Sequence, residues 1–152
     1  MRLWNETLPV ARSQMRKPAA GDVFTYPFLW KRQQIKGETE GRKPRPVCMA
    51  VTTANAEGNT VLFIVPITTQ QPMDGRIAVE VPEIEAKRAG LDSEKPCWVM
   101  LDEFNSDVFE RSYVFEDRTP LGAFSSKFTA RLQGTLLAAA KDGKARIVNR
   151  QD

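Results

Sequence analysis

The amino-acid sequence predicts a mainly β fold with two helices, arranged as a small, strongly bent sheet or barrel. Short extended segments recur along residues 22–115, turn-forming Gly, Pro and Asn residues separate them, and an amphipathic helix closes the chain. A length of 152 residues, 41% of them hydrophobic and 27% charged, is typical of one folded domain with a sizeable core. Because the first residues lack a clear period, we expect an N-terminal arm at 1–20 and a domain at 21–152.

The first predicted strand begins at Asp22 and carries an aromatic residue at every second position. These residues are Phe24, Tyr26, Phe28 and Trp30. Alternation places all four on one face of an extended segment, which is the pattern of a core-facing strand. Phe28 and Trp30 stand at the end of this strand, where both core packing and stacking on a nucleobase are open to them. Pro27 predicts an edge strand or a bulge.

The segment that follows is polar and charged. We predict a loop at 31–44 that is longer than most hairpin loops, and long ordered loops are often functional. Further strands are predicted at 46–53, 61–68, 77–81, 97–101 and 112–115. The second of these contains the continuous apolar run VLFIVP, which is typical of a buried strand.

Two helices complete the predicted fold. A short one spans 82–90, because Pro82 suits the first helical position and Gly90 suits the left-handed residue that ends a helix. A longer one spans 126–141, with Ser125 as its N-cap. Its apolar stripe consists of Phe128, Leu132, Leu136, Ala139 and Ala140. That stripe is expected to cover the open side of the sheet or barrel.

Histidine is absent from the sequence, which excludes every mechanism that needs an imidazole. Ser-His-Asp hydrolysis, paired-histidine ribonuclease chemistry and His-ligated zinc are therefore ruled out. Cys48 and Cys97 alone cannot complete a four-ligand zinc site. They are able to form one disulfide, but two buried thiols fit their apolar surroundings better. We expect neither a metal nor a cofactor.

The sequence also lacks the marks of a membrane or secreted protein. The N-terminal segment has no apolar stretch of the secretory type, and no apolar run approaches the roughly 20 residues that span a bilayer. We therefore expect a cytoplasmic protein with no membrane partner.

The net charge of +3 is concentrated in the first third of the chain. Residues 1–50 hold ten Lys and Arg against four Asp and Glu, whereas residues 51–100 hold four against seven. The cations of the first third include Lys31, Arg32, Lys36, Arg42, Lys43 and Arg45. This segment is the first candidate for contact with phosphates.

Two strand ends carry candidate chemistry. Arg45 directly precedes one predicted strand, and Thr68, Thr69 and Gln70 end the next. If neighbouring strands bring them together, an arginine fork beside hydroxyl donors makes a phosphate site, with Lys43 nearby. The plainer alternative is a solvated edge arginine and an ordinary turn.

The same segments carry a family resemblance. The motifs are Gly21-Asp22-Val23, Glu40 five residues before Arg45-Pro46, Pro66-Ile67-Thr68-Thr69-Gln70, Gly90-Leu91 and Leu101-Asp102-Glu103. In this order, and followed by the closing amphipathic helix, they resemble the MazF/PemK/Kid toxins, the bacterial mRNA interferases of toxin–antitoxin pairs. The resemblance runs from Gly21 to about Lys141.

This resemblance implies an SH3-like barrel of five to seven strands with a short inserted helix and a C-terminal helix, assembled as a homodimer. It implies a metal-independent endoribonuclease that cleaves single-stranded RNA at short sequences, in which the 2′-OH attacks the adjacent phosphorus. It also implies an acidic, partly disordered antitoxin protein that neutralises the toxin.

The resemblance assigns roles to individual residues. Arg45 and Thr68 align with the family's catalytic pair, and Glu40 aligns with a loop carboxylate that is our first choice of base. Glu38 is the reserve, and the alternative is that both carboxylates only pair with loop cations. We also expect contacts to RNA from Phe28, Thr69, Gln70, Asp102 and Lys43.

Two of these RNA contacts have alternatives. Asp102 either orients Arg45 or the RNA, or caps a turn, and Phe28 either lines the RNA groove or packs in the core. The family's Asp-Gln-x-Arg stretch reads Asp102-Glu103-Phe104-Asn105 here, so an amide and a cation are lost.

Two other function classes remain open. The first is a non-catalytic SH3-like module that binds RNA or protein through Arg45, Trp30 and its loops. The second is a gyrase poison of the CcdB type, which needs a C-terminal helix ending in a Trp-Gly-Ile tip. This chain ends GKARIVNRQD instead, which disfavours the gyrase poison.

Overall fold

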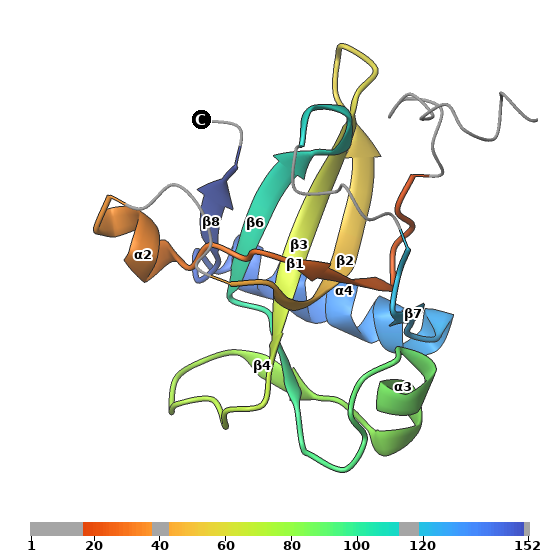
Figure 1. Cartoon of the computed structure of the whole chain (residues 1–152). Coiled ribbons are helices and arrows are strands. Elements are labelled where there is room, and N and C mark those ends of the chain that lie inside the picture. Colours follow the sequence, from red (N-terminus) through yellow and green to blue (C-terminus); the bar gives the residue numbers. More distant parts are fainter. Residues whose placement is uncertain (1–16, 38–42, 113–118, 151–152) are drawn as a thin grey trace, which may run out of the picture.

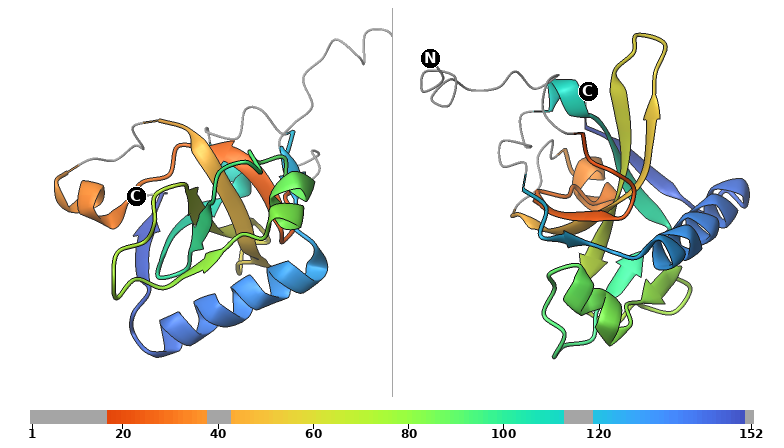
Figure 2. Two further views of the ribbon diagram at one scale, coloured as in Figure 1. Left: turned by 90° about the horizontal axis from the view of Figure 1, so that it is seen from below. Right: turned by 90° about the vertical axis from the view of Figure 1, so that its right-hand side faces the viewer.

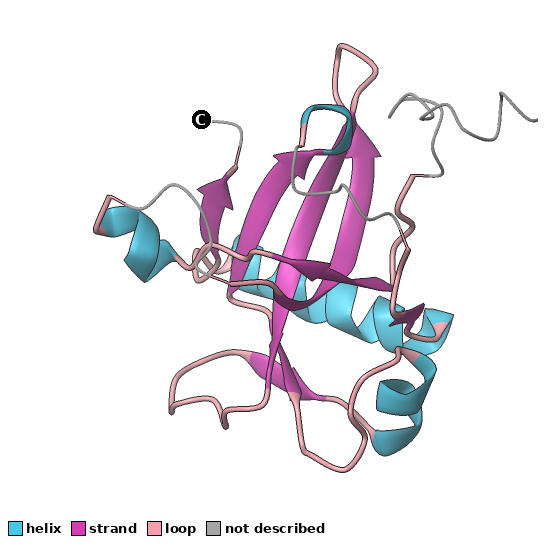
Figure 3. Cartoon of the chain, in the orientation of Figure 1, coloured by secondary structure: helices cyan, strands magenta, loops and turns pink. Residues whose placement is uncertain are grey.

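A computed structural model describes residues 17–37, 43–112 and 119–150. The described chain forms an eight-stranded, mainly antiparallel sheet with helices around it (Figures 1 and 3). The strands are β1 (Asp22–Tyr26), β2 (Arg45–Ala54), β3 (Thr60–Thr68), β4 (Ala78–Glu80), β5 (Trp98–Met100), β6 (Glu103–Val108), β7 (Gly122–Ala123) and β8 (Arg146–Asn149). The helices are α2 (Lys31–Ile35), α3 (Glu83–Arg88), α4 (Ser126–Lys141) and the 3₁₀ turn η2 (Phe109–Arg111). The mainly β prediction with added helices is confirmed.

Strand β3 is the centre of the sheet. It pairs with β2 along most of its length and with β6 between Val61 and Ile64, and its last residues Ile67 and Thr68 pair with β5. Because β3 changes partner near its end, the sheet divides there, and β4 and β5 extend away from β2 (Figure 1). Strand β1 pairs with the first half of β2, and β8 pairs in parallel with β6.

Helix α4 lies across one face of the sheet (Figure 2). Its buried residues Phe128, Leu132 and Leu136 join the larger core cluster, as predicted, whereas Ala140 of the predicted stripe is exposed. The Ser125 hydroxyl accepts a hydrogen bond from the Phe128 amide at 3.2 Å, so the predicted N-cap is confirmed. None of the described helices is long and apolar enough to cross a membrane.

The alternating aromatic residues pack together in a second core cluster. Phe24, Tyr26, Phe28 and Trp30 all belong to it. Pro27 interrupts the strand, so β1 ends at Tyr26, yet Phe28 and Trp30 remain buried beyond it. The shared face that alternation predicted therefore continues past the end of the hydrogen-bonded strand.

Several predicted elements need correction. The segment 31–44 is not only a loop, because α2 occupies its first residues. Pro82 is the N-cap of α3 rather than its first helical residue. Ser112 lies in no strand, and residues 113–115 of that predicted strand lie outside the described residues. The sequence interpretation missed β6, β7 and β8. The two cysteines are buried free thiols, as expected.

Candidate functional site

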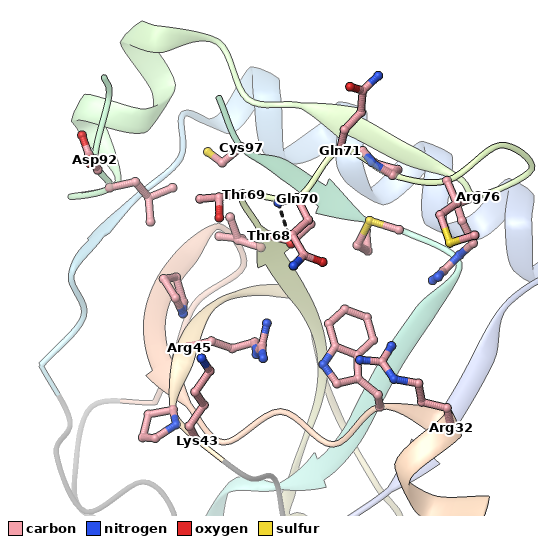
Figure 4. A pocket seen from close by; sticks show the side chains of 18 residues that line it. Arg32, Lys43, Arg45, Thr68, Thr69, Gln70, Gln71, Arg76, Asp92 and Cys97 are labelled. Atoms are coloured by element: carbon pink, nitrogen blue, oxygen red, sulfur yellow. Dashed lines mark hydrogen bonds between the residues drawn. The ribbon is translucent and has the colours of Figure 1, made fainter. Parts of the chain in front are cut away.

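A groove of about 640 Å³ opens where the start of β2 meets the end of β3 (Figure 4). Four cationic side chains line it: Arg32, Lys43, Arg45 and Arg76. Asp92 is the only carboxylate among its described lining residues. The groove therefore has the electrostatic character of a binding site for an anion.

The sheet register brings the two predicted catalytic residues together. Strands β2 and β3 are antiparallel, with Val47 opposite Pro66. Arg45, the first residue of β2, lies two residues before this last pair, and Thr68, the last residue of β3, lies two residues after it. Both side chains line the groove, together with Lys43, Thr69 and Gln70 (Figure 4).

Thr68 is oriented by a local turn. Its hydroxyl oxygen accepts a hydrogen bond from the Gln70 backbone amide at 3.1 Å (Figure 4). An oxygen that already accepts a bond keeps its own hydrogen for donation. Thr68 is half-buried, whereas Thr69 and Gln70 are exposed at the rim. The Thr68 hydroxyl is thus arranged to donate a hydrogen bond to a ligand in the groove.

Arg45 has a buried, unpaired nitrogen. Its Nε atom is buried and makes no hydrogen bond within the described residues, and its guanidinium carbon lies 5.5 Å from the centroid of the Trp30 ring. Burial, and then the nearby charge of Arg32, lowers the pKa of Arg45. An arginine remains cationic at neutral pH even so. Its positive charge therefore has no fixed counter-charge in the described part of the chain.

The segment beneath Arg45 is held by the side chain of Asn105 on β6. Asn105 accepts a hydrogen bond from the Leu29 amide at 2.9 Å and donates one to the Leu29 carbonyl at 2.7 Å. The Trp30 amide donates to the Gln33 side chain at 3.0 Å, which begins α2. Phe28 is 1% exposed and packs edge-to-face against Trp30 at 5.1 Å. As placed, Phe28 has no open face for a nucleobase, so it matches the core-packing alternative.

Arg76 lies at the other side of the groove and is tightly paired. Its Nε and Nη2 atoms donate to the two carboxylate oxygens of Asp102 at 2.8 and 2.9 Å, and Nη2 also reaches Glu103 at 3.3 Å. The Ile77 amide donates to Asp102 at 3.1 Å. Burial alone would raise the pKa of Asp102, but the hydrogen bonds from Arg76 and Ile77 outweigh it and lower that pKa. Asp102 therefore orients Arg76 and not Arg45, which corrects the first of the two roles expected for it.

The predicted residues thus divide into three groups. The structure brings Arg45, Thr68, Thr69, Gln70 and Lys43 together in one groove. It places Phe28 in the core and Asp102 on Arg76. Glu40 and its reserve Glu38 lie outside the described residues.

Sequence reasoning missed one groove cation, Arg76, and one anchor, Asn105, and it gave no individual role to another groove cation, Arg32. Arg76 stands in a polar connection between two strands, where nothing local marks it as special. Arg32 was only one of several cations in the basic first third, and Asn105 was noted only as a departure from a family pattern. The single usable signal was that Arg32 stands only two residues after the aromatic Trp30, although this spacing alone does not set the cation against the ring.

In chemical terms the groove offers fixed positive charge and a hydroxyl donor, which is what a phosphodiester needs for binding and for charge stabilisation. Among the described residues, no group of three or more His, Cys, Asp or Glu side chains is arranged to hold a metal ion. No model of a known protein family matches the chain, and no curated protein matches it either.

Proposed function

We propose that this chain is a metal-independent endoribonuclease of the MazF/PemK/Kid kind, cleaving single-stranded RNA in the groove between β2 and β3. The observation that carries the proposal is the meeting of Arg45 and Thr68 in one groove, with the Arg45 charge unpaired among the described residues. These are the two residues that the family resemblance assigns to catalysis. They come from different strands, and the antiparallel register supports their meeting.

The reaction is an internal transfer at phosphorus. The 2′-oxygen of the RNA forms a bond to the adjacent phosphorus, the bond from phosphorus to the 5′-oxygen breaks, and a 2′,3′-cyclic phosphate and a 5′-OH result. The 2′-OH loses its proton to a base, for which Glu40 is our candidate, and the leaving 5′-oxygen gains a proton. Arg45 is suited to neutralise the charge on the five-coordinate phosphorus and to deliver that proton, and burial lowers its pKa in the direction that favours this role.

Thr68 complements Arg45 as a neutral donor. Its hydroxyl is oriented by the Gln70 amide, so it can donate to a non-bridging phosphate oxygen without reorganising. Removing one preorganised donor of this kind lowers the rate of cleavage by roughly 10²- to 10³-fold. The same range is expected for Thr68→Val, and Arg45→Ala is expected to cost at least as much.

The test is cleavage of a long single-stranded RNA in the presence of EDTA, with detection of 5′-OH ends. Wild type is expected to cleave, and Arg45→Ala and Thr68→Val are expected to lose activity while keeping their melting temperatures. The matched control is Arg131→Ala, which removes an exposed arginine on α4 far from the groove residues in sequence. Full activity in Arg45→Ala would overturn the assignment of Arg45.

A second candidate function is RNA binding without cleavage. One observation favours it: the described lining of the groove holds four cations against a single carboxylate, Asp92, which suits binding of a polyanion more than proton abstraction. Retention of RNA on a filter without any 5′-OH product, at every RNA sequence tried, would support this candidate over the nuclease.

The family resemblance extends the proposal to the assembly. We propose an SH3-like barrel that forms a homodimer in the cytoplasm and is neutralised by an acidic antitoxin lying over the groove cations. Light scattering on a sizing column tests the dimer. Growth after induced expression, wild type beside Arg45→Ala, tests toxicity, and arrest in both or in neither would contradict an Arg45-dependent toxin.

A further inference from the structure

Two arginines share one tryptophan ring in the groove. The guanidinium carbon of Arg32 lies 5.1 Å from the centroid of Trp30, and that of Arg45 lies 5.5 Å from the same centroid. Both arginines line the groove, and Figure 4 shows both pointing toward its middle. No carboxylate among the described residues forms an ion pair with either of them.

Such a pair is unfavourable in the absence of an anion. Like charges held close together repel, and the charge of Arg32 is the second cause, after burial, that lowers the pKa of Arg45. The indole face offsets part of this repulsion through cation–π attraction. A phosphate group bound between or beside the two guanidiniums would remove the remaining repulsion and add charge-assisted hydrogen bonds.

The position of Trp30 is defined by its neighbours. Asn105 holds the backbone of Leu29 through two hydrogen bonds, and Gln33 accepts from the Trp30 amide. The next residue, Lys31, donates its backbone amide to the buried Glu103 side chain. Trp30 is itself 7% exposed. The backbone at Trp30 is therefore held in place, its ring packs edge-to-face against Phe28, and α2 begins directly after it with Arg32 in the first turn.

We propose that Arg32 is a second phosphate-contacting residue of the groove and that Trp30 is the positioning residue that sets Arg32 and Arg45 beside the same RNA strand. This inference rests on the proposed function, because it takes RNA as the ligand. It adds Arg32 on α2, a residue to which the family resemblance assigns no role. Arg32 contributes to binding of the strand, whereas Arg45 also acts on the reacting phosphorus.

The experiment separates binding from cleavage by using a short RNA in which every 2′-OH is methylated, so that no internal nucleophile is present. Its affinity is measured at several salt concentrations for wild type, Arg32→Ala, Arg32→Lys and Trp30→Leu. The matched control is Lys36→Ala, which removes an exposed cation at the end of the same helix that does not line the groove. Cleavage of unmodified RNA is measured in parallel as kcat and KM.

Arg32→Ala is expected to weaken binding roughly tenfold at low salt and to reduce the salt slope by about one, as loss of one phosphate contact does. KM is expected to rise with kcat changed by less than a few-fold, and Arg32→Lys is expected to recover only part of the affinity because an ammonium lacks the planar fork. Trp30→Leu is expected to weaken binding, and adding Arg32→Ala to it should cost little more, because both changes act through the same contact.

The outcomes distinguish the two proposals. If wild type cleaves RNA but Arg32→Ala binds like Lys36→Ala, the inference about Arg32 is wrong and the nuclease stands. If wild type cleaves nothing while Arg32→Ala loses affinity and salt slope as stated, the nuclease is wrong and the role of Arg32 stands. Additive losses in the Trp30→Leu and Arg32→Ala double variant would overturn the positioning role of Trp30.

Discussion

The groove holds arginines in two contrasting environments. At one side, Arg45 and Arg32 both lie close to the Trp30 ring and pair with no described carboxylate. At the other side, Arg76 is bound by both oxygens of Asp102 and approached by Glu103. The three side chains have the same chemistry, and only their neighbours differ.

This difference separates cations that are available to a ligand from one that holds the fold together. The charge of Arg76 is compensated by Asp102 and Glu103, which are 5% and 2% exposed, so Arg76 connects the loop before β4 to the start of β6. The charges of Arg45 and Arg32 have no counter-ion among the described residues, which costs stability unless an anion binds. A count of the cations that line a groove therefore overstates its affinity for anions. Only a cation without a protein counter-ion is available to bind an anionic ligand.

The largest effect expected from this comparison is on stability. Arg76→Ala leaves two nearly buried carboxylates without their cation, so we expect the free energy of unfolding to fall by about 3 kcal/mol or more. Arg45→Ala removes a charge that has no counter-ion among the described residues, and we expect it to change the free energy of unfolding by less than about 0.5 kcal/mol. Urea denaturation of both variants measures the difference. If both variants lost the same free energy of unfolding, the paired and the unpaired arginine would contribute equally to stability, which would contradict the difference described above.

The next largest effect is the coupling energy between Arg76 and Asp102. Asp102→Asn keeps the shape of the side chain but removes its charge, and we expect a loss of about 2 kcal/mol. Combining it with Arg76→Gln should cost less than the sum of the two single losses, by about 1 kcal/mol or more, because each single change removes the same interaction. The cycle is completed by urea denaturation of all four proteins. Strict additivity would show that the pair contributes nothing as a pair.

The sequence predicted the unpaired side of the groove better than the paired side. Arg45 and Thr68 sit at strand ends that periodicity locates, and the sequence analysis expected them to meet if their strands were neighbours, which β2 and β3 are. Asp102 was placed in the site but with the wrong partner among the arginines. Its partner Arg76 lies 26 positions away, in a connection whose path depends on where β5 and β6 pair. No local pattern in the sequence indicates a contact between residues so far apart.

Sequence reasoning missed strand β6 for a physical reason. Strand β6 reads EFNSDV, in which Asn105 and Asp107 are buried among hydrogen-bonding partners rather than exposed on a polar face. Alternation of apolar and polar residues does not find a strand whose buried positions are polar. These same polar positions anchor the site, because Asn105 holds Leu29 and thereby Trp30.

A smaller effect concerns acid. The pKa of Asp102 in the folded chain is lowered, so its stabilising contribution is complete above the pKa of an unfolded aspartate, about 4, and is lost as the pH falls below it. We therefore expect the free energy of unfolding to decrease between about pH 5 and pH 3, and to decrease less in Asp102→Asn. Burial would raise the pKa of Glu110, but the hydrogen bonds from Thr60 outweigh it and lower that pKa. Glu110→Gln should therefore remove a separate part of the dependence of the free energy of unfolding on pH. An identical pH profile in wild type and Asp102→Asn would contradict the assignment.

The smallest effect expected is a shift in melting temperature on addition of inorganic phosphate, and it bears most directly on the unpaired side. An anion that binds only the folded chain stabilises it by linkage, and one weakly held phosphate is expected to raise the melting temperature by roughly 1–3 °C at millimolar concentration. Because Arg45 and Arg32 have no counter-ion in the described part of the chain, Arg45→Ala should lose this shift, whereas Arg131→Ala, on the exposed face of α4, should keep it. Sodium chloride at equal ionic strength controls for general screening of charge. If phosphate stabilises Arg45→Ala as much as wild type, the anion binds elsewhere, and the uncompensated charge beside Trp30 does not mark the ligand site.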